Sequence, residues 1–160
     1  MPDTQKIEIL ALQLADSAFP SGSFAHSGGI EAARNWGEVP SPESLKNYLE
    51  TVLRQSPFGT LPLIIAAYRK TDAFAEIDQL SNAVLSNHVA RRSSSVQGRA
   101  LLSTASRVFD VAAIGQLRKQ VKEQGLPAHL APVFGFLACQ MEIPLDKALQ
   151  VFLYTFLRDL

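Results

Sequence analysis

The chain has 160 residues, of which 47% are apolar and 19% are charged, and this composition is typical of a folded globular protein rather than a disordered one. Fifteen Lys and Arg residues balance fifteen Asp and Glu residues, and this formal net charge of zero disfavours a nucleic-acid-binding protein. The absence of a long apolar run, an N-terminus unlike a signal peptide, and a single cysteine predict a cytoplasmic protein without membrane segments or internal disulfides.

Residues 15–31, ADSAFPSGSFAHSGGIE, lie between two helix-like segments. Two aromatic residues, Phe19 and Phe24, lie among Gly, Ser and Pro residues that can bend the backbone around them. This pattern predicts a loop of fixed shape in which the two aromatic side chains are buried. The loop leads into the helix that carries Glu31. We assign backbone shaping, rather than contact with a partner, to Pro20, Gly22, Phe24, Gly28 and Gly29.

Helical spacing continues along the chain. Leu45, Tyr48, Leu49, Val52 and Leu53 form one apolar stripe, preceded by Ser41 as an expected N-cap and Pro42 in the first turn. Residues 61–68 are apolar on all sides, which favours a central buried helix, with a β-strand as the alternative.

Phe74, Ile77, Leu80 and Val84 begin a further apolar stripe of helical spacing. Helices are also expected at 88–109 and at about 110–124, 130–141 and 145–160. Gly125, Leu126 and Pro127 form the expected stop after residue 124, with glycine in the left-handed conformation. No alternating strand pattern is found. We therefore predict a compact, single-domain, all-α bundle of about seven to nine helices over residues 1–160.

The helix expected at 88–109 has two distinct faces. Ser94 and Gly98 share one face with apolar residues, and this small-xxx-small step predicts close approach of a neighbouring helix, which is the role we assign to Gly98. The other face carries Arg92, Val96, Arg99, Ser103 and Arg107. It is either a solvated basic face or a stripe that binds a partner protein.

A search for catalytic and metal-binding patterns gives no candidate. His26, His88 and His129 lack a second ligand at metal-binding spacing within their own segments, so we assign no metal ligands and no catalytic residues. Sites assembled from distant segments or across a dimer stay open. Cys139 lies in an apolar helix and is interpreted as a small core residue.

Four stretches together resemble the urease accessory protein UreF family. They are the run Pro20, Gly22, Phe24, Ser27, Gly29, Glu31, then RRSSSVQGRALL at 91–102, HLAPVFG at 129–135 and LYTFLRDL at 153–160. Each stretch is weak alone, but their order and the helical background make the resemblance specific.

The resemblance implies an all-α, non-catalytic, homodimeric protein that acts in the maturation of urease. It implies a bridge between UreD (also called UreH) and the GTPase UreG, through which nickel reaches the urease apoprotein under control of GTP hydrolysis. It also implies that this chain binds no cofactor of its own. The zero net charge predicts no nucleic-acid partner, and the lack of a long apolar run predicts no membrane partner. Partner contacts are expected at His26, Ser27, Glu31, Arg92, Arg99 and Arg158.

Some interpretations stay open at this stage. Position 26 is His where the family often has Tyr, and the family continues beyond the position of Leu160 with a further helix and tail, so a shortened chain is expected. Glu31 either binds a partner or forms an internal cap or ion pair. Arg158 either binds a partner or pairs with Asp159.

Three rival functions are considered. They are an all-α enzyme using His26 or His129, a helix-turn-helix nucleic-acid binder, and a helical interaction module with an unrelated partner.

Overall fold

The computed structural model describes residues 4–16 and 29–158, and within these ranges it contains nine α-helices, two short 3-10 helices and no β-strand. The prediction of an all-α fold is confirmed. In chain order the elements are α1 (Thr4–Ala15), α2 (Ile30–Asn35), α3 (Pro42–Gln55), η2 (Ser56–Phe58), α4 (Thr60–Arg69), η3 (Thr71–Ala73), α5 (Phe74–Val84), α6 (His88–Val108), α7 (Ala112–Gln124), α8 (Leu130–Gln140) and α9 (Leu145–Arg158).

Helix α8 is the centre of the fold. All residues from 131 to 138 are buried, and α4, α5, α6, α7 and α9 pack around this helix. Residues 61–68 form a helix, as predicted, and not a strand. However, the expectation that this segment is the central buried helix is wrong, because only Ile64 and Ala67 of α4 are fully enclosed.

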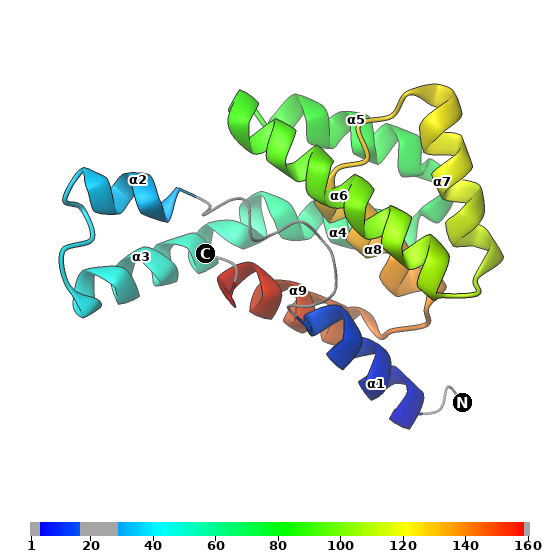
Figure 1. Cartoon of the computed structure of the whole chain (residues 1–160), viewed down its shortest axis with the longest axis horizontal. Helices are drawn as coiled ribbons and strands as arrows, with labels where there is room; N and C mark the ends of the chain where they lie inside the picture. Colours follow the sequence, from blue (N-terminus) through cyan, green and yellow to red (C-terminus); the bar gives the residue numbers. More distant parts are fainter. Residues whose placement is uncertain (1–3, 17–28, 159–160) are drawn as a thin grey trace.

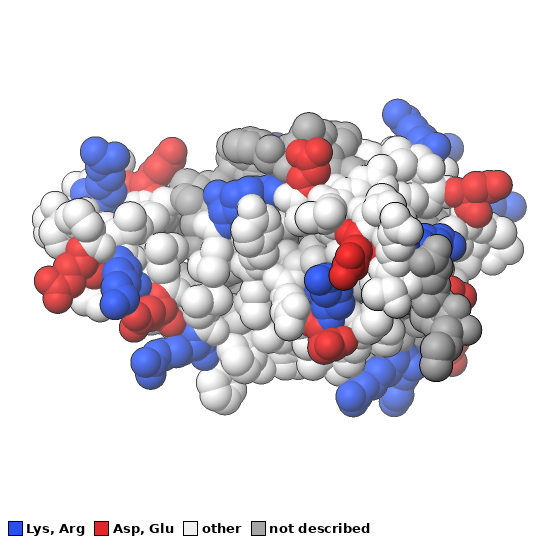
Figure 2. Space-filling view, turned by 90° about the horizontal axis from the view of Figure 1, so that it is seen from below, with Lys and Arg blue, Asp and Glu red and all other residues white. Residues whose placement is uncertain are grey.

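The remaining helices are placed around this centre. α2 and α3 extend from one end of the molecule, α1 and α9 lie side by side along one edge, and α5, α6 and α7 lie on the opposite side (Figure 1). The face seen in Figure 2, viewed from the α1 and α9 edge, carries Lys and Arg interspersed with Asp and Glu. No helix in the described ranges has the length and apolar character needed to span a membrane.

Two predicted helix ends are confirmed by their hydrogen bonds. The Ser41 hydroxyl accepts from the Ser44 N–H at 3.2 Å, and the Ser44 hydroxyl accepts from the Ser41 N–H at 2.9 Å, forming a capping box. Gly125 ends α7 with φ of 63°, and the Leu126 N–H donates to the Val121 carbonyl at 3.0 Å. The left-handed conformation explains why glycine stands at position 125.

The buried face of α5 departs from the apolar stripe read from the sequence. Phe74 and Ile77 are buried as expected, but Leu80 and Val84 are exposed. The buried face instead continues through Asp78 and Ser81, which follow Phe74 at i+4 and i+7. The apolar pattern was misleading here because two polar residues complete the inward face.

The apolar residues of α9 pack against other helices of the same chain. α9 packs against α1, α8 and α4, the Phe152 ring lies edge-on to Phe134 with centroids 5.2 Å apart, and Phe152 and Phe156 are stacked. An Arg158 guanidinium nitrogen donates to the Ala15 carbonyl, which ties the end of α9 to the end of α1. Tyr154 alone among the large apolar residues of α9 within the described range is strongly exposed.

Candidate functional site

The structure places only part of the predicted site. Pro20, Gly22, Phe24, His26, Ser27 and Gly28 lie outside the described residues. Glu31 is exposed in the first turn of α2. The helix begins directly after Gly29, which has φ of 100°. Glu31 forms no ion pair or hydrogen bond with the part of the chain that the structure describes, so the internal cap or ion pair considered for it is not found there.

A buried carboxylate fixes the start of the central helix. Asp78 of α5 is fully buried, and its two oxygens accept hydrogen bonds from the backbone N–H groups of Ala128 and His129 at 2.8 and 2.6 Å. Helix N-termini leave several N–H groups without partners inside the helix. A carboxylate from a neighbouring helix therefore supplies both the acceptors and the negative charge that this end of α8 favours.

Helix α6 holds the same segment from the other side. The Ser94 hydroxyl accepts from the Leu130 N–H at 3.2 Å, while the Ser95 hydroxyl and Arg99 Nε both donate to the Pro127 carbonyl. A Cβ on Gly98 would lie 2.0 Å from the Ala128 carbonyl oxygen. Glycine is therefore required where α6 crosses the start of α8, and the close neighbour is this backbone segment.

The junction unites two stretches that were read separately in the sequence. Residues 94–99 belong to the Arg/Ser-rich stretch and residues 127–130 enter the His-x-x-Pro stretch, and the structure brings them into direct contact. Sequence reasoning missed Asp78 completely. The available signal was its position on the same helix face as Phe74, Ile77 and Ser81.

His129 is enclosed within this junction. Its side chain is 1% exposed, Nε2 lies 3.3 Å from Asn82 Oδ1, and Nδ1 has no hydrogen-bond partner among the described residues. Burial lowers the pKa of His129, and the positive charges of Arg91 and Arg99 lower it further, whereas Asp78 acts in the opposite direction. The imidazole is therefore neutral near pH 7.

We expect the free energy of unfolding to fall as the pH is lowered through about 6.5, the ordinary pKa of histidine. Between this value and the lower pKa of the folded state, the unfolded chain binds a proton at His129 that the folded chain does not bind. The free energy of unfolding stops falling once the pH is below the pKa of the folded state. Urea titrations of the unmodified chain and of His129→Gln between pH 7.5 and 5.5 measure this slope. His129→Gln is expected to flatten it, whereas His88→Gln, at an exposed position, is expected to keep it. Equal slopes in the unmodified chain and His129→Gln would contradict this prediction.

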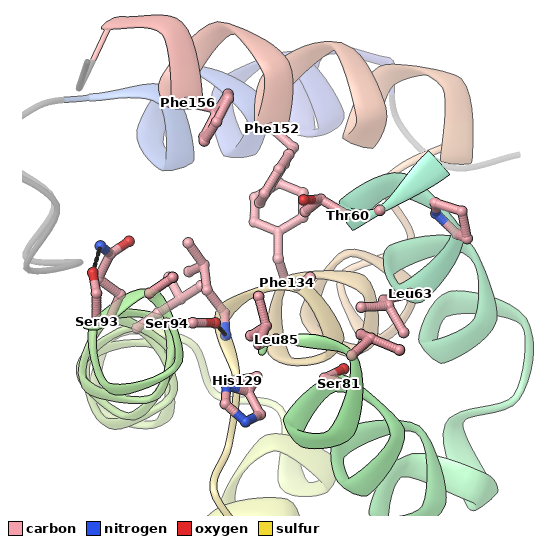
Figure 3. A pocket seen from close by; sticks show the side chains of 18 of the residues that line it. Thr60, Leu63, Ser81, Leu85, Ser93, Ser94, His129, Phe134, Phe152 and Phe156 are labelled. Atoms are coloured by element: carbon pink, nitrogen blue, oxygen red, sulfur yellow. Dashed lines mark hydrogen bonds between the residues drawn. The ribbon is translucent and has the colours of Figure 1, made fainter. Parts of the chain in front are cut away.

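A groove lies beside the junction. Its volume is about 590 Å³, and its lining comes from α1, α4, α5, α6, α8 and α9. In Figure 3, Phe134, Phe152 and Phe156 approach from α8 and α9, Leu63 from α4, and Ser93 and Ser94 from α6. Phe58, which is 90% exposed, stands at its edge.

The groove is poor in charged and metal-binding side chains. Its lining is mostly apolar, and Arg158 is the only charged side chain among the described lining residues. No cluster of three or more His, Cys, Asp or Glu residues able to hold a metal ion occurs in the described ranges. Cys139, predicted to be a core residue, is only half-buried, and burial raises the pKa of its thiol.

The arginines predicted to bind partners differ in their surroundings. Arg92 is exposed on α6, and Arg99 is exposed although its Nε is bonded to the Pro127 carbonyl. Arg158 is half-buried and bonded to Ala15. The structure therefore separates these three residues into an exposed pair on α6 and one arginine that joins two helices.

Comparison with known proteins finds relatives of this chain. The family model of UreF matches residues 39–160. Urease accessory protein F of Oryza sativa subsp. indica is 34% identical over 151 residues, which cover 92% of this chain and 58% of that protein. Urease accessory protein F of Arabidopsis thaliana is 33% identical, with 92% and 63% covered, and urease accessory protein UreF of Kocuria rhizophila is 29% identical, with 89% and 62% covered.

The chain thus spans 58–63% of the length of these relatives. No solved structure shows a significant match to it. The family match extends over more than half of the chain and includes the α5–α6–α8 junction. The chain therefore belongs to the UreF family of urease accessory proteins.

Proposed function

We propose that this chain is a non-catalytic adaptor in urease maturation, which bridges UreD/UreH and the GTPase UreG in the cytoplasm. In this proposal nickel is the cargo of the assembled complex, GTP is bound by UreG, and the chain needs no cofactor of its own. We expect it to act as a homodimer and to influence the GTPase through contact. Its final client is the urease apoprotein.

One observation carries this proposal: the UreF family match over residues 39–160. The described surface supports it, because an apolar groove and exposed arginines are typical of protein contacts. An enzyme would instead need acidic and basic side chains that converge on a substrate. A helical interaction module with an unrelated partner would share these surface properties, so the identity of the partner decides between them.

Co-purification with the UreD/UreH and UreG proteins of the same organism tests the proposal. We expect the chain to be recovered with UreD/UreH alone and to recruit UreG when both are present. A longer version of the chain, closer in length to these relatives, should be assayed in parallel. Failure of both versions to bind either protein would refute the adaptor function.

Glu31 is expected to contribute to a partner contact. Its carboxylate is exposed and forms no interaction with the described residues, so Glu31→Ala removes a charge without breaking a contact seen in the fold. We expect Glu31→Ala to reduce urease activation several-fold in a reconstituted maturation assay, with unchanged thermal unfolding. Glu43→Ala is the matched control, because Glu43 is also exposed in a first helical turn, at the start of α3. Equal activation by the two variants would exclude the role of Glu31.

A further inference from the structure

Charge is distributed unevenly along this neutral chain. Between residues 79 and 109 there are four arginines, at positions 91, 92, 99 and 107, and no Asp, Glu or Lys. This segment contains the whole of α6, the longest helix of the described fold. The α1 and α9 edge, in contrast, mixes both signs (Figure 2). Helix α6 is therefore the part of the molecule where positive charge accumulates.

Three of these arginines lie along one face of α6. At 100° per residue, Arg92, Arg99 and Arg107 fall within an arc of about 80°, and they extend over about 22 Å of helix. All three are exposed. Arg118 of α7 joins them, because its guanidinium donates to the Ser106 hydroxyl at 3.2 Å. We call these four residues the arginine surface.

None of the four arginines of the arginine surface forms an ion pair with the described residues. The two ion pairs found there, Lys46–Glu50 and Lys119–Glu123, belong to α3 and α7 and involve none of the four arginines. Arg92 and Arg107 form no hydrogen bond or ion pair with the described residues. Four guanidinium groups thus remain available to carboxylates of another molecule, for which their planar donor geometry is well suited.

The centre of the arginine surface is apolar. Val96 lies within the same arc of α6, between Arg92 and Arg99, and is 50% exposed. An apolar side chain among arginines is the composition of a protein interface. A nucleic-acid duplex fits less well, because 22 Å of duplex presents about 13 phosphates, which four arginines would leave mostly unneutralised.

We propose that the arginine surface docks an acidic protein surface with an apolar residue at its centre, opposite Val96. This inference rests on the adaptor function proposed above and adds the chemistry of one contact. In this contact, carboxylates of the partner form ion pairs with Arg92, Arg99, Arg107 and Arg118. The exposed face of α6 that carries Val96 packs against the partner between these pairs. The surface is separate from the groove, because the groove is lined by Ala90, Ser93 and Gln97 on the other side of α6.

Binding measurements with charge-reversed variants test this inference. The dissociation constants of the chain for UreD/UreH, UreG and urease apoprotein are measured separately at 50 and 300 mM NaCl. The dissociation constant for a 20-base-pair DNA duplex is measured in the same way. We expect binding to one of the three proteins to weaken at least about tenfold at the higher salt. Arg92→Glu combined with Arg107→Glu should weaken that complex at least about tenfold at 50 mM NaCl.

Lys46→Glu combined with Lys70→Glu is the matched control. It changes the net charge by the same amount at two exposed positions outside the arginine surface, and we expect less than about a twofold effect. Thermal unfolding of both double variants establishes that they fold. Equal binding by the arginine variant and the unmodified chain would overturn this inference alone. So would arginine-dependent binding of the duplex with protein binding unaffected. Failure of the unmodified chain to bind any of the three proteins would overturn the adaptor function and this inference with it.

Discussion

Gly98→Ala is expected to lower the free energy of unfolding by about 3 kcal/mol, at the upper end of the range for overpacked cores. The added Cβ would lie 2.0 Å from the Ala128 carbonyl oxygen, 2.7 Å from the His129 carbonyl carbon and 2.8 Å from the Leu130 nitrogen. All three atoms belong to the backbone, so no side-chain rotation relieves the overlap. For a chain of this size we expect the melting temperature to fall by roughly 10 °C.

Gly115→Ala provides the matched control for this substitution. Gly115 also lies inside a helix, α7, but it is exposed and a Cβ there would meet no atom within 4 Å. We expect this variant to gain up to about 1 kcal/mol, because alanine has the higher helix propensity. The prediction fails if both variants unfold at the same temperature.

Asp78→Ala is expected to lower the free energy of unfolding by about 4 kcal/mol. The substitution leaves the N–H groups of Ala128 and His129 buried without their acceptors and removes a charge that stabilises the start of α8. Asp78→Asn should show a smaller loss, because its amide oxygen still accepts one hydrogen bond while its NH₂ group faces a second donor. Urea-induced unfolding followed by circular dichroism measures both losses.

Gln79→Ala controls for the change in α5 itself, since Gln79 is the next residue along the helix and is exposed. We expect an effect within about 0.5 kcal/mol for this surface position. A loss below about 1 kcal/mol for Asp78→Ala would mean that water replaces the carboxylate, and it would contradict the role assigned to Asp78.

Local patterns in the sequence were sufficient to predict most of the helices. The periodic apolar residues of α3, the N-cap at Ser41 and the stop at Gly125 act over a few residues, and each appears in the structure at the expected position. The bounds of α6, α7 and α8 differ from those expected by one or two residues, which is the usual uncertainty of a helix end.

Contacts between distant segments could not be predicted in the same way. Asp78 and His129 are 51 positions apart, and the sequence alone does not indicate that a buried carboxylate meets the start of α8. The exposure of Leu80 and Val84 was missed for the same reason, because helix propensity and periodicity do not specify which neighbours cover a helix. The arginine pattern was visible in the sequence, but the absence of ion pairs between these arginines and the described residues became apparent only in three dimensions.

The junction at residues 127–130 also has a dynamic consequence. Asp78 of α5 and three residues of α6 hold one short backbone segment, so α5, α6 and α8 cannot separate without breaking all of these hydrogen bonds together. Such a unit opens cooperatively, and its amide protons exchange with solvent only in the rare globally unfolded state. We therefore expect the amides of residues 133–138 to be the slowest to exchange in deuterated buffer, while those of α2 exchange through local fraying.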